Sequence, residues 1–79
     1  SEAAARAEYH AACATSSADA QAVTRHVESH GYEPPYRARF EQAAASSRKS
    51  QKARGVYARA QAARVGAERA LRRLTQERA

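Results

Sequence analysis

The sequence predicts an all-α protein, either a helical hairpin or a three-helix arrangement, on three observations. Alanine supplies 22 of the 79 residues and has the highest intrinsic helix propensity. Small and apolar side chains recur at alternating steps of four and three residues, which places them on one stripe of a helix. The only two prolines are adjacent, at Pro34 and Pro35, so the chain should turn once, between two long alanine-rich halves.

The first helix is expected over about residues 2–30. Ser1 can cap its start, and Glu2 in the first turn suits the positive end of the helix dipole. Gly31 is well placed as the left-handed residue that ends it. The polar run 15–17 could instead end one helix and begin another, but a single helix is favoured because one stripe runs through it. Its members are Tyr9, Cys13, Ser16, Ala20, Val23, Val27 and His30.

A turn is expected over 31–35, and Pro35 is acceptable at the first position of a second helix. The apolar residues of that helix change sides along its length. The face of Tyr36 and Phe40 lies about half a turn from the stripe that begins at Val56. The change of phase falls in the polar run 46–52. Either the helix breaks over 46–55, giving helices of about 36–46 and 55–78, or one long helix presents two faces to two partners.

The later stripe, here called the alanine stripe, allows close helix contact but buries little apolar area, because four of its six members are alanine. A continuous second helix would extend roughly 20 Å past the first, and the part from about Ala63 to Leu74 would need another chain. We therefore expect a helix–helix contact with a partner through these six residues: Val56, Ala60, Ala63, Ala67, Ala70 and Leu74.

The chain is expected to form one small domain, residues 1–79, with little core of its own. Leu, Ile, Val and Phe together fall well below a fifth of the residues, the level that marks ordinary globular chains. Homo-oligomerisation or membership of a larger assembly is therefore expected to supply part of the stability.

Charge is distributed unevenly along the chain. Residues 1–35 hold two arginines against five acids, a net −3, and residues 36–79 hold twelve basic groups against three acids, a net +9. The basic half points to nucleic acid or an acidic protein surface as partner. Arg outnumbers Lys twelve to two, which suits bidentate contacts with phosphate or carboxylate. The residues expected to bind the anionic partner are Arg48, Lys49, Lys52, Arg54, Arg59, Arg64, Arg69, Arg72 and Arg73.

Catalytic and cofactor signatures are not found in the sequence. His26 and His30 could reach one metal from a helix, but no third ligand stands at a characteristic spacing. Cys13 has no neighbouring base, and the three glycines are isolated, which excludes a glycine-rich phosphate loop. We expect no enzyme, metal or cofactor. No apolar run reaches the roughly 18 residues of a membrane span, so an intracellular (cytoplasmic) or virion location is expected.

Two functions agree with these features. The first is a small non-enzymatic binding protein whose basic C-terminal half engages nucleic acid through its phosphates. The alternative is a protein–protein interaction or assembly subunit, such as a virion component or an inhibitor, whose alanine stripe packs on another helix.

Overall fold

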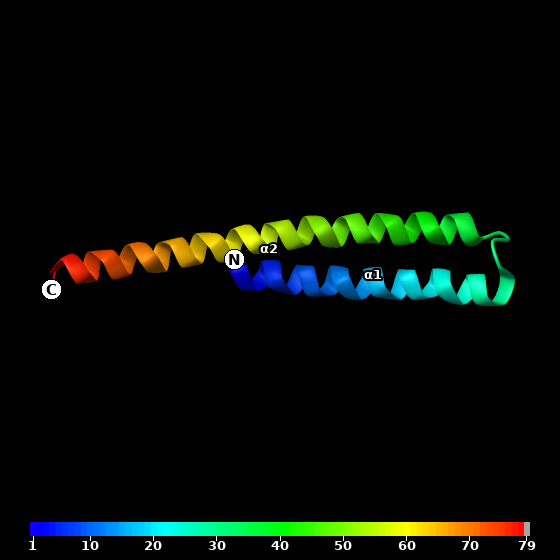
Figure 1. Cartoon of the computed structure of the whole chain (residues 1–79), viewed down its shortest axis with the longest axis horizontal. Coiled ribbons are helices and arrows are strands. Elements are labelled where there is room, and N and C mark those ends of the chain that lie inside the picture. The colour runs from blue at the N-terminus through cyan, green and yellow to red at the C-terminus, as the bar shows by residue number, and fades with distance from the viewer. Residues whose placement is uncertain (79) are drawn as a thin grey trace.

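The computed structural model describes residues 1–78, which form two antiparallel helices joined by a turn (Figure 1). Helix α1 spans Glu2–His30 and helix α2 spans Tyr36–Arg78. The molecule is a rod of 69 × 15 × 14 Å. The all-α class and the helical hairpin are thereby confirmed, and the part of the chain that the structure describes contains no strand.

Helix α1 is capped by Ser1 and ends before Gly31 as the sequence indicates, but Gly31 does not adopt the left-handed helical conformation expected for it. The Ser1 hydroxyl accepts a hydrogen bond from the Ala4 N–H at 3.2 Å, and Glu2 lies in the first turn. At the other end Gly31 adopts φ 62° and ψ −138°, a conformation that L side chains rarely adopt, and its N–H donates to the Val27 carbonyl at 2.9 Å. These two caps set the length of α1 at 29 residues.

The turn is tied to α1 by a buried histidine. The Nε2–H of His26 donates a hydrogen bond of 2.6 Å to the carbonyl oxygen of Glu33. The same carbonyl accepts the N–H of Tyr36 at 2.9 Å, in the first turn of α2. His26 is only 7% exposed, and the ring of His30 lies 5.4 Å away on its own helix. A side chain of α1 therefore fixes the point at which α2 begins.

Helix α2 is continuous, so the break that we considered over 46–55 does not occur. The reason lies in the serines of the polar run. The Ser46 hydroxyl donates to the Ala43 carbonyl at 3.1 Å, and the Ser50 hydroxyl donates to the Ser47 carbonyl at 2.8 Å. Hydroxyls that bond to carbonyls of their own helix leave the backbone ladder intact, whereas a cap would interrupt it.

The residues of α2 that contact α1 recur every seven positions. They are not the large apolar residues of that helix. Phe40 is 53% exposed and Val56 is 40% exposed, so neither is central to the contact. The phase change in the sequence therefore does not correspond to a change in the packed face. The contact residues at this spacing, half-buried except for the exposed Arg64 at the end, are Tyr36, Ala43, Ser50, Tyr57 and Arg64.

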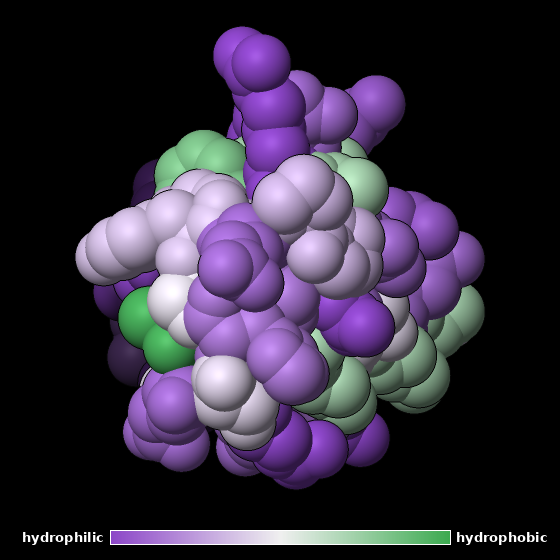
Figure 2. Space-filling model, turned by 90° about the vertical axis from the view of Figure 1, so that its right-hand side faces the viewer, coloured by the Kyte–Doolittle hydropathy of each residue, from purple (hydrophilic) through white to green (hydrophobic). Residues whose placement is uncertain are grey.

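The interior of the hairpin is thin. Within residues 1–78 only Ala5 and His26 are buried. Tyr9 of α1 and Tyr57 of α2 make an aromatic contact across the interface, with ring centroids 6.0 Å apart. Figure 2, which looks along the rod from the turn, shows a mostly polar end with small separate apolar patches. Helix propensity and capping must therefore supply much of the stability.

The C-terminal part of α2 extends past α1. The two helices differ by 43 − 29 = 14 residues, or about 21 Å, close to the roughly 20 Å expected from the sequence. Every residue from 66 to 78 is exposed, and Figure 1 shows this segment projecting beyond the N-terminus. We call residues 66–78 the overhang. No helix in the described residues has the length and apolar character needed to cross a membrane.

Candidate functional site

The outward side of α2 carries six basic residues, here called the basic face. At about 100° per residue they lie at least a third of a turn from the side that contacts α1. All six are exposed, and they extend over 25 residues, or about 38 Å of helix. The basic face consists of Arg48, Lys52, Arg59, Arg69, Arg72 and Arg73.

The basic face is not neutralised within the chain. Over residues 1–78 the ion pairs are Arg37–Glu41 at 3.7 Å and the contacts of Arg64 with Glu2 and Glu68. None of these involves a residue of the basic face. Within residues 1–78 the opposite charges of the two halves are therefore joined across the hairpin only by the Arg64–Glu2 pair, and the outward cations form no ion pair there.

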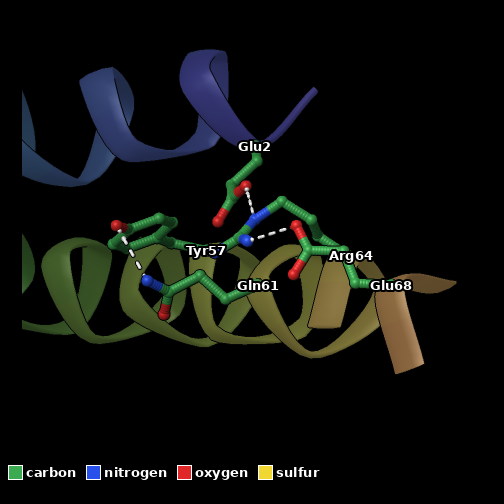
Figure 3. Close-up of polar contacts among 5 residues, drawn as sticks. All are labelled: Glu2, Tyr57, Gln61, Arg64 and Glu68. Carbon is green, nitrogen blue, oxygen red and sulfur yellow. Dashed lines mark hydrogen bonds and ion pairs between the residues drawn. The ribbon is translucent and has the colours of Figure 1, made fainter. Parts of the chain in front are cut away.

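Arg64 differs from the other predicted anion-binding residues because it forms ion pairs within the chain. Its Nε donates to Glu2 Oε2 at 2.6 Å, and its Nη1 donates to Glu68 Oε1 at 2.9 Å (Figure 3). These two carboxylates, Glu2 more than Glu68, raise the pKa of Arg64 above its ordinary value. The same view shows the Gln61 amide donating to the Tyr57 hydroxyl at 2.9 Å. Arg64 thus belongs to a polar cluster at the open end of the hairpin.

Two further predicted cations, Lys49 and Arg54, flank the interface between the helices. Lys49 and Glu8 line an open groove of about 410 Å³ between α1 and α2. The charge of Arg54 acts on the phenol of Tyr9, whose pKa is nevertheless raised, mainly by a hydrogen bond with Cys13. These two cations therefore lie nearer to α1 than the basic face does.

The alanine stripe is only partly covered by α1. Ala60 is half-buried, whereas Val56, Ala63, Ala67, Ala70 and Leu74 are exposed. The sequence reasoning missed Leu71, which is 65% exposed and lies seven residues after Arg64. The seven-residue spacing from Tyr36 through Tyr57 was the signal that could have identified it.

The histidines and the cysteine are not gathered into a reactive site. His26 holds the turn, and Cys13 is half-buried beside Tyr9. The described residues contain no group of three or more His, Cys, Asp or Glu side chains placed to hold a metal ion. Comparison of the chain with protein-family models, curated proteins and solved structures finds no match. The features that can carry a functional proposal are thus the basic face and the overhang.

Proposed function

We propose that this chain is a small non-enzymatic helical protein that binds nucleic acid through contacts between its basic face and phosphates. The observation that carries the proposal is the state of the six cations. They are exposed, they form no ion pair within residues 1–78, and they lie on one side of a helix over about 38 Å.

The dimensions of duplex DNA suit this arrangement. A duplex carries one negative charge per roughly 1.7 Å of axis, so 38 Å of duplex presents about 22 charges to the six cations. Each contact releases condensed counterions, which is the main source of affinity that does not depend on sequence. Five of the six residues are arginine, whose planar guanidinium can contact two phosphate oxygens at once.

Recognition of a particular base sequence is not part of the proposal. Side chains that read bases are typically a small set of Arg, Asn or Gln residues on a helix that enters the major groove. The basic face carries no such cluster of amides, and its cations are spread along the rod. Binding is therefore expected to be similar for unrelated duplexes of equal length.

The alternative, an assembly subunit, is favoured by one separate observation. Leu71 and Leu74 are 65% and 56% exposed on the overhang, and binding to phosphates does not explain why they are exposed. Exposed leucines on one side of a helix suit contact with another helix. The two functions are compatible, because these leucines and the basic face occupy different sides of α2.

The proposal is tested by a triple variant and a control with the same change in charge. Arg48→Gln, Lys52→Gln and Arg59→Gln together remove three cations of the basic face. Arg6→Gln, Arg25→Gln and Arg37→Gln remove three exposed cations from elsewhere. We expect the first variant to bind two unrelated duplexes at least about tenfold more weakly at about 50 mM salt, with a smaller loss for the control.

Equal losses in the two variants would mean that only net charge matters, and would contradict the basic face as the site. Affinity for one duplex but not the other would contradict phosphate-based binding. An affinity of the wild-type chain for an acidic protein but for no nucleic acid would favour the assembly function.

A further inference from the structure

The face of α2 that packs on α1 continues into the overhang. Contact residues of α2 recur every seven positions as far as Arg64, and the next position is Leu71. Ala67 and Leu74 lie on the same side, four residues before and three residues after it. We call these three residues the leucine face; it contains both leucines of the chain. Beyond α1, the interface thus continues as an exposed apolar stripe.

The leucine face lies beyond the reach of α1. Glu2, in the first turn of α1, contacts Arg64, and Tyr9 contacts Tyr57. In both pairs the residue numbers sum to 66, so α1 runs along α2 in one fixed register. Ser1 therefore lies opposite about residue 65. Residues 66–78 have no helix beside them in the described chain, so this side of the overhang is open to a contact with another helix.

We propose that the occupant is the overhang of a second copy, packed antiparallel about a twofold axis. In such a dimer each overhang takes the place beside its partner's α2 that α1 takes in the hairpin, and continues the line of α1. The contact is self-complementary, as a twofold interface must be. An interface already present in the hairpin is simply extended by a second chain of the same sequence.

The register of the dimer follows from the leucines. Placing Leu71 of one copy opposite Leu74 of the other puts the axis midway between them, so paired residue numbers sum to 145. Arg78 of one copy then lies opposite Ala67 of the other. Ala67 is two residues beyond the position that Ser1 faces.

The basic face lies away from this contact, whereas Arg78, seven residues after Leu71, lies on the side of the leucine face. Arg69, Arg72 and Arg73 lie on the side of the overhang away from the leucine face, at least a third of a turn from its centre. The basic face stays exposed, and the dimer places two basic faces on one longer rod.

The contact is short, so the dimer should be reversible. Each copy contributes two leucines and one alanine, and two helices of about 12 residues bury less than the roughly 1,000 Å² expected of a stable interface. We expect sedimentation velocity on the full chain to show a mass that rises from 8.6 kDa towards twice that value between about 10 μM and 1 mM.

The leucine face is tested with a helix-compatible substitution. Leu71→Gln together with Leu74→Gln should remain at 8.6 kDa across the range, and circular dichroism should show that the helices are retained. Val56→Gln changes an exposed apolar residue outside the overhang and should dimerise like the wild type. A wild-type mass of 8.6 kDa at about 1 mM, or a leucine variant that dimerises normally, would overturn the proposal.

The distance between spin labels in the two copies distinguishes an antiparallel from a parallel dimer. A spin label at Ala63→Cys, with Cys13→Ser, would lie about 14 Å along the helix from the twofold axis in each copy. The two labels would then be about 28 Å apart along the axis, whereas a parallel dimer would place them about 10 Å apart. A short distance in the dimer would contradict the twofold antiparallel contact.

Discussion

Arg64 Nε of α2 lies 2.6 Å from Glu2 Oε2 of α1, at the end of the hairpin opposite the turn. The pair joins residues 62 positions apart in the chain. It lies at the boundary between the part of α2 that α1 covers and the overhang. Arg64 also contacts Glu68, one turn further along α2. The pair therefore closes the hairpin, and its loss should loosen the first turn of α1.

Glu2→Gln should lower the free energy of unfolding only slightly, because the Arg64 and Glu2 side chains are 50% and 27% exposed and solvent screens their attraction. The loss should shrink at about 1 M salt, where the screening length falls to roughly 3 Å. Glu41→Gln is the control, since its pair with Arg37 is 71–93% exposed and lies within one helix. Equal effects of the two variants would contradict a closing role for Glu2.

His26→Ala should destabilise the hairpin by about 1–2 kcal/mol, because it removes a buried ring and the hydrogen bond to the Glu33 carbonyl. His30→Ala is the matched control: it makes the same substitution one turn later in α1, at an exposed position. Urea unfolding followed by circular dichroism measures both. If the two variants were equally stable, the turn would not depend on His26.

The glycines should respond in opposite directions. Gly31→Ala should cost about 1–2 kcal/mol, because φ is +62° at this position. Gly66→Ala should stabilise the protein by up to about 1 kcal/mol, since a Cβ there meets nothing within 4 Å and alanine is the better helix former. Thermal unfolding of the two variants at equal concentration tests this. Stabilisation by Gly31→Ala would contradict the turn geometry.

The fold could be predicted from local signals, because Ser1, Gly31 and the adjacent prolines determine the backbone structure of the residues next to them. The packed face of α1 was largely predicted, since Tyr9, Cys13, Ser16, Val23 and Val27 of its stripe are half-buried. That of α2 was not, because the prediction followed large apolar residues and this chain has few. Its contacts are made by Ser50, by alanines and by Tyr57. A break at the serines of the polar run was one of two alternatives, but their hydroxyls bond within a continuous helix.

Only the part of the candidate site that depends on local spacing could be predicted from the sequence. The exposed cations of the basic face follow from helical spacing, which is a local property. The engagement of Arg64 does not, because its partner Glu2 is brought close only when the hairpin closes. Leu71 was missed because it lies one residue outside the alanine stripe. It belongs instead to the row of residues spaced by seven that includes Tyr57 and Arg64.

The most direct test of the nucleic-acid function is the salt dependence of binding to two unrelated duplexes of equal length. If the basic face contacts phosphates, the logarithm of the association constant should fall linearly with the logarithm of salt concentration. Its slope should be the same for both duplexes and no steeper than about −5, or −0.9 for each of six contacts. The absence of binding at about 50 mM salt, or a slope near zero, would contradict the proposal.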